Sequence, residues 1–91
     1  MASISITRKH SLSHKKAKDA AEKIAKDLQK RFDLDYEWHG DHIDFERPGV
    51  SGQMHVGKDR IKIDVQLGLL LGMLKPTIER EIGVQMDKLL A

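Results

Sequence analysis

The sequence predicts an α+β protein of two layers, in which an antiparallel sheet of about five short strands carries two amphipathic helices on one face. Short segments in which apolar and polar residues alternate predict strands with one solvated face. Two longer segments repeat apolar residues every three or four positions, as helices packed on such a sheet do. The expected order is strand, helix, four strands, helix. The 91 residues are expected to form a single domain, residues 1–91.

The first strand is expected at residues 3–7, where Ile4 and Ile6 alternate with small polar residues. A helix over about residues 13–32 follows, with Ser11 or Ser13 as its N-cap. Its inner face is apolar and rich in alanine: Ala17, Ala20, Ala21, Ile24, Ala25, Leu28 and Phe32. Helical spacing predicts three ion pairs on its outer face: Asp19 with Lys23, Glu22 with Lys26, and Asp27 with Arg31.

Two hairpins are expected next. In the first, residues 34–47, alternating apolar residues flank a turn at HGD. The stretch RPGVSG, residues 47–52, holds one proline and two glycines and is expected to be a loop. The second hairpin pairs QMHV, residues 53–56, with RIKIDVQL, residues 60–67, across GKD.

The last helix is expected over residues 75–90, with Pro76 in its first turn. Its inner stripe is Leu74, Ile78, Ile82, Met86 and Leu89, with Val84 off the stripe. Gly83 weakens this helix by about 1 kcal/mol relative to alanine, so its presence needs a local reason.

The run VQLGLLLGMLKP, residues 65–76, is the most apolar part of the chain. Its ends belong to the core, while Leu69, Leu70, Leu71 and Met73 form the crossing from the sheet to the last helix. Gly68 and Gly72 are expected to permit tight bends there. The sequence favours a crossing that is fully buried. The alternative is that one or two of these residues face outward and make a patch suited to a partner subunit or an apolar surface.

Composition narrows the classes of function. The chain has no cysteine, which excludes disulfides and thiolate chemistry and fits a reducing compartment. The N-terminus has no secretory signal, and no segment approaches the roughly 18 consecutive apolar residues of a membrane span. We therefore expect a cytoplasmic protein. Charge is uneven: a basic segment over residues 8–31 is followed by an acidic one over residues 33–46.

Catalytic and metal chemistry find little support in the sequence. His39 and His42 stand in HGDH with Asp41 and Asp44 nearby, but no second cluster supplies further ligands. They are better interpreted as exposed turn histidines, and His10, His14 and His55 as surface residues. Ser51 has no neighbouring base and no nucleophile elbow around it. We expect no catalytic residues, no metal site and no cofactor, and hence no enzyme.

The basic helix face offers an alternative function. Lysines form a broad cationic surface there and would suit nucleic-acid phosphates: Lys15, Lys16, Lys18, Lys23, Lys26 and Lys30. The interleaved acids and the lack of an aromatic stacking ladder on the strands argue against this interpretation.

Several segments resemble the bacterial polyhydroxyalkanoic acid system family across nearly the whole chain. The most specific are R-x-G-V-S-G at residues 47–52 and L-G-x-L-L-G at residues 67–72; the N-terminal strand, HSL element and amphipathic helix fit as well. The resemblance implies no catalytic residues. It implies a connection with storage-polymer granules through the genes beside which the family is encoded. Pro76 and the many lysines of the first helix depart from the family pattern.

We therefore expect a non-enzymatic accessory protein of the polyhydroxyalkanoate granule system, cytoplasmic or at the granule surface. It would bind a protein partner, itself or the granule surface through Leu69, Leu70, Leu71 and Met73. The alternative is a small basic nucleic-acid-binding regulator that uses the lysine face of the first helix.

Overall fold

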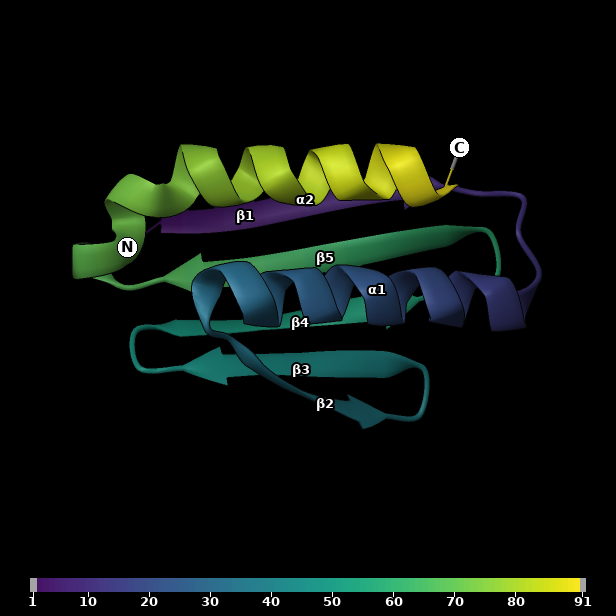
Figure 1. The fold of residues 1–91 in the computed structure, drawn as a ribbon, viewed down its shortest axis with the longest axis horizontal. Coiled ribbons are helices and arrows are strands. Elements are labelled where there is room, and N and C mark those ends of the chain that lie inside the picture. The colour runs from purple at the N-terminus through teal and green to yellow at the C-terminus, as the bar shows by residue number, and fades with distance from the viewer. Residues whose placement is uncertain (1, 91) are drawn as a thin grey trace.

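The structure, a computed structural model, describes residues 2–90; the side chains of Ala2 and Leu70 lie outside the described part. The elements follow in the order β1 (Ala2–Lys9), α1 (His14–Phe32), β2 (Asp35–His39), β3 (His42–Arg47), β4 (Val50–Val56), β5 (Arg60–Leu67), the 3₁₀ helix η1 (Leu69–Leu74) and α2 (Lys75–Leu90). The strands form one sheet in the order β1-β5-β4-β3-β2, and every pair of neighbours is antiparallel. Figure 1 shows both helices on the same face of this sheet, which confirms the predicted two-layer α+β fold.

The core lies between the sheet and the two helices. In β5 the residues that face the helices are all buried, whereas their neighbours on the open face are polar: Arg60, Lys62, Asp64 and Gln66. The six apolar residues of α1 other than Phe32 that were expected to face inward are buried, and four of these are alanines. Small side chains let the helix axis lie close to β4 and β2 beneath it. In α2, Ile78, Ile82 and Met86 complete the core, and Val84 is exposed as expected.

The ends of α1 are fixed by local hydrogen bonds. The Ser13 hydroxyl accepts a bond from the backbone N–H of Lys16 at 3.2 Å, so Ser13 is the N-cap. At the other end, Asp33 adopts a left-handed conformation with φ of 58° and donates its N–H to the carbonyl of Gln29. The helix therefore stops beside β2 and the start of α2, at the end of the molecule where η1 lies (Figure 1).

The prediction of a loop at residues 47–52 was wrong for all but two of its residues, because β3 extends to Arg47 and β4 follows after the turn. Only Pro48 and Gly49 form the turn, and β4 already begins at Val50. The reason is tertiary: Val50 is buried, and the strand pairs with β3 on one side and β5 on the other. Pairing on both sides outweighs the loop character of a local V-S-G sequence.

His10 is not the surface residue that the sequence suggested. It is 8% exposed, and its ring joins the exit of β1 to the turn before β5. Nδ1 accepts a hydrogen bond from the backbone N–H of Leu12 at 3.2 Å, so the ring proton sits on Nε2, which donates to the Gly57 carbonyl at 3.3 Å. The HSL element is therefore structural: it fixes the crossing from β1 to α1.

Candidate functional site

The crossing from β5 to α2 is a 3₁₀ helix. Its bonds run from each N–H to the carbonyl three residues earlier, as from Leu71 to Gly68 at 3.1 Å and from Lys75 to Gly72. Three residues per turn place every third side chain on the same side, so Leu71 and Leu74 point one way. Both line a pocket between the helices and the sheet. The other two sides of η1 point away from that pocket.

The expectation of a fully buried crossing was wrong. Leu69 is 84% exposed and Met73 is 82% exposed, whereas Leu71 is half-buried. The side chain of Leu70 lies outside the described residues. We call Leu69 and Met73 the η1 patch. Of the four residues expected to bind a partner, these two are exposed to do so, and Leu71 belongs to the interior instead.

The two most specific sequence segments touch at this point. Gly49, with φ of 85°, leaves space that Leu71 fills: a Cβ added at Gly49 would lie 3.1 Å from Leu71 Cδ1. The N–H of Gly68 donates to the carbonyl of Gly49 at 2.7 Å. The turn between β3 and β4 therefore holds the start of η1, the helix that carries the η1 patch, in place.

Behind η1 lies a pocket of about 340 Å³ between the end of α1, the start of α2 and the sheet. Its walls are mainly apolar: Phe32, Leu34, Val50, Val65, Leu71, Leu74 and Ile78. Two cations and one acid complete the lining: Arg31, Arg47 and Asp33. Sequence reasoning missed this pocket, because it forms only where the two helices meet over β4.

The two arginines of the pocket differ in their partners. Arg31 pairs with Asp27 at 2.8 Å and with Glu81 at 3.2 Å; the hydrogen bond to Asp27 is the largest cause that raises the pKa of Arg31. Arg47 donates from Nη1 to the carbonyl of Phe32 at 2.7 Å, while its buried Nε has no hydrogen-bond partner. No carboxylate among the described residues lies within ion-pairing distance of Arg47.

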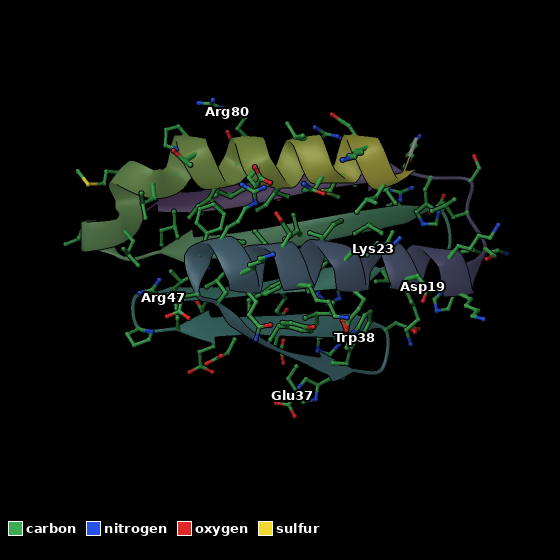
Figure 2. The ribbon with its side chains drawn as sticks, viewed as in Figure 1. Asp19, Lys23, Glu37, Trp38, Arg47 and Arg80 are labelled. Carbon is green, nitrogen blue, oxygen red and sulfur yellow. The ribbon has the colours of Figure 1, made fainter. Side chains whose placement is uncertain are left out.

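The lysine face of α1 is present, but its ion pairs differ from those expected. Asp27 pairs with Arg31 as predicted. Glu22 instead accepts hydrogen bonds from the Tyr36 hydroxyl and from Nε1 of Trp38, which lies beneath α1 (Figure 2). Neither Glu22 with Lys26 nor Asp19 with Lys23 occurs among the ion pairs of the described residues.

One lysine of this face is part of the fold. Lys18 lies 5.1 Å from the centre of the Trp38 ring, and its Nζ is 3.5 Å from Asp41. Asp41 also accepts a hydrogen bond from His14, which is the largest cause that lowers the pKa of that carboxyl. The other lysines are exposed and form no ion pair with any described residue: Lys15, Lys16, Lys23, Lys26 and Lys30.

The structure brings three histidines together on the open face of the sheet. His39, His42 and His55 are directly opposite one another on β2, β3 and β4, with ring centres 5.6 Å and 5.3 Å apart. His39 and His42 both lie beside Asp44, at 3.3 Å and 3.6 Å. Sequence reasoning did not connect His55 with the other two because the strand register was not known. Over the described residues, no group of three or more such side chains is placed to hold a metal ion.

No helix in the described part of the chain is long and apolar enough to cross a membrane.

Comparisons with known proteins place the chain in a family. A family model described as "Putative polyhydroxyalkanoic acid system protein" matches residues 4–90. No curated protein and no solved structure matches the chain. The match includes the segments R-x-G-V-S-G and L-G-x-L-L-G, which meet at η1. The chain belongs to the polyhydroxyalkanoic acid system protein family.

Proposed function

We propose that the protein is a non-enzymatic accessory protein of the polyhydroxyalkanoate granule system, which docks through the η1 patch on an apolar surface. That surface is the storage granule or one of its coat proteins. The observation that carries the proposal is the exposure of Leu69 and Met73, at 84% and 82%. Two large apolar side chains this exposed on one six-residue helix support an interaction site there.

The expected strength of docking follows from these two side chains. Transfer of a fully exposed Leu or Met side chain out of water stabilises a complex by about 1.5–3 kcal/mol each. Removing both contacts should therefore cost about 3–6 kcal/mol, which is a loss of roughly 100- to 20,000-fold in affinity.

The test is co-sedimentation with purified polymer granules and their coat proteins. The wild-type protein is compared with the double variant Leu69→Ser, Met73→Ser, in which both substitutions lie on the exposed sides of η1. Val84→Ser is the matched control, because Val84 is another exposed apolar residue, 53% exposed, on α2 rather than η1. We expect wild type and control to sediment with granules and the double variant to stay in solution. Equal sedimentation of all three would refute docking through the η1 patch.

In a variant of this proposal, the η1 patch binds a second copy of the protein. Sedimentation velocity over a range of protein concentrations separates it from granule docking. If wild type alone forms a dimer that the double variant does not form, the apolar surface is that of another copy. A monomer at all concentrations would leave the granule or its coat as the docking surface.

A nucleic-acid-binding regulator is the second candidate, favoured by the five exposed lysines of α1 that lack ion pairs with described residues. Binding through phosphates would weaken steeply with salt. The slope of log K against the logarithm of the salt concentration falls in magnitude by about 0.7–0.9 for each phosphate contact removed. A Lys23→Glu, Lys26→Glu variant, measured by fluorescence anisotropy with a labelled duplex at about 50 mM salt, should lose most of the affinity. Absence of binding by wild type at that salt would exclude this candidate.

A further inference from the structure

We propose that the pocket behind η1 binds an aliphatic carboxylic acid, with its carboxylate at Arg47 and its chain among the apolar walls. The pocket lies between α1, α2 and β4, and Arg47 projects into this end of the molecule beside the last turn of α1 (Figure 2). The inference does not depend on docking through the η1 patch, because neither Leu69 nor Met73 lines the pocket.

Arg47 indicates the charge of the ligand. A guanidinium is a cation with five N–H donors and no acceptor, so it binds anions. Here Nη1 has the Phe32 carbonyl as its partner, Nε is buried without one, and no described carboxylate balances the charge. A partly buried cation without a counter-ion is unfavourable, and an anion that enters the pocket removes that cost.

Arg31, in contrast, already has counter-ions. Although it lines the same pocket, it is already paired with Asp27 and Glu81. The pocket therefore offers one uncompensated cation, which suits a singly charged carboxylate better than a phosphate of higher charge. The exposed carboxylate of Asp33, on the same lining, disfavours a second negative charge further.

The walls indicate the rest of the ligand. Seven of the ten lining residues have apolar side chains, so a polar or sugar-like ligand would leave its hydroxyl groups without partners. The volume of about 340 Å³ is at the small end of ligand pockets. At about 30 Å³ for each water-sized group, it holds a ligand of up to about ten non-hydrogen atoms. A straight-chain acid of about six to eight carbons meets both conditions.

Binding requires a small side-chain adjustment. The Nε atom is shielded from water in the ligand-free structure, so a carboxylate reaches it only if a neighbouring side chain moves. Leu74 forms the outer wall and is 38% exposed, which leaves it room to turn outward. Ligand should therefore change the environment of η1 residues that do not touch its carboxylate.

The experiment is a titration followed by NMR, with hexanoate as the probe and 1-hexanol as its uncharged counterpart. We expect hexanoate to bind wild type with a Kd of about 1 mM or tighter. The shifts should centre on Phe32, Leu71 and Ile78. 1-Hexanol should bind at least tenfold more weakly. Equal affinities for the acid and the alcohol, or shifts centred elsewhere, would overturn the proposal.

Two variants test the site itself, and each has a defined outcome. Arg47→Gln should reduce hexanoate affinity at least tenfold, to that of 1-hexanol, while Arg80→Gln, on the outer side of α2 (Figure 2), should leave it unchanged. Leu74→Trp fills the pocket from its outer wall and should abolish binding of both probes. It also keeps the test decisive if Arg47→Gln weakens the fold. Wild-type affinity in Arg47→Gln or in Leu74→Trp would refute the assignment.

Discussion

Among the glycines whose surroundings the structure describes, Gly52 is the one at which a single added methyl group should do the most damage. It lies in β4, opposite Phe45 of β3 and Val65 of β5. A Cβ built there would lie 2.6 Å from the carbonyl oxygen of Asp64 and 3.1 Å from the Cα of Val65. Both are backbone atoms of the neighbouring strand, so neither can move aside by a change of rotamer.

The Gly52→Ala variant must therefore push β4 and β5 apart in the middle of the sheet. Overpacking of a well-packed interior costs about 1–3 kcal/mol, and strain on backbone atoms belongs at the upper end of that range. Weakening of the local ladder adds about 1 kcal/mol. We expect a loss of about 4 kcal/mol in the free energy of unfolding. For a domain of this size, that is a drop of roughly 15–30 °C in Tm.

Urea denaturation followed by Trp38 fluorescence measures the change, with Gly40→Ala as the matched control. Gly40 sits in the turn between β2 and β3, where a Cβ meets nothing within 4 Å and only its φ of 63° is unfavourable for alanine. That conformation costs about 1–2 kcal/mol. If Gly52→Ala were no more destabilising than Gly40→Ala, close approach of the strands would not be the reason for glycine at position 52.

Three further predictions use the same methods. Gly83→Ala should stabilise the protein by about 1 kcal/mol in urea denaturation, because the new Cβ lies 3.7 Å from the Arg8 guanidinium, an ordinary contact; a loss of stability would show that α2 needs the glycine. His10→Ala removes two hydrogen bonds and a buried ring and should cost about 2–3 kcal/mol, measured in the same way. The pKa of Asp41 is lowered chiefly by the His14 hydrogen bond, so this stabilisation is present above the unfolded pKa and lost as pH falls through the folded one; carboxyl NMR titration of His14→Ala should show the Asp41 pKa moving up.

Hydrophobic periodicity alone predicted the elements that bury one face and expose the other. α1 and β5 are the clearest cases, because each has one apolar face and one charged face over its whole length. The loop predicted at residues 47–52 fails over residues 50–52 for the opposite reason. Val50 belongs to a strand only because β3 and β5 already stand on either side of it, and pairing between distant segments leaves no local signal.

The candidate site was predictable in outline and not in detail. The leucine-rich run marked the right segment. A search for the α-helical period of 3.6 does not predict which side chains face inward in a 3₁₀ helix, whose period is 3. Arg47 opens the R-x-G-V-S-G segment, but its contact could not be predicted, because it depends on the end of α1 reaching the end of β3, where Phe32 supplies the carbonyl. The histidine row likewise depends on the register of β3 and β4, which the turn at residues 48–49 sets.

The geometry of η1 gives one short segment two separate tasks. A six-residue helix with three residues per turn has one side for the interior, taken by Leu71 and Leu74, and it cannot bury Leu69 and Met73 as well. Its start is held by the bond from Gly68 to Gly49, and its end runs directly into α2. Because the segment is fixed at both ends, docking through Leu69 and Met73 requires little ordering of the backbone, and this lowers the entropic cost of association. If ligand entry turns the Leu74 side chain outward, as proposed above, occupancy of the pocket and docking at the patch should change each other's affinity by the same factor.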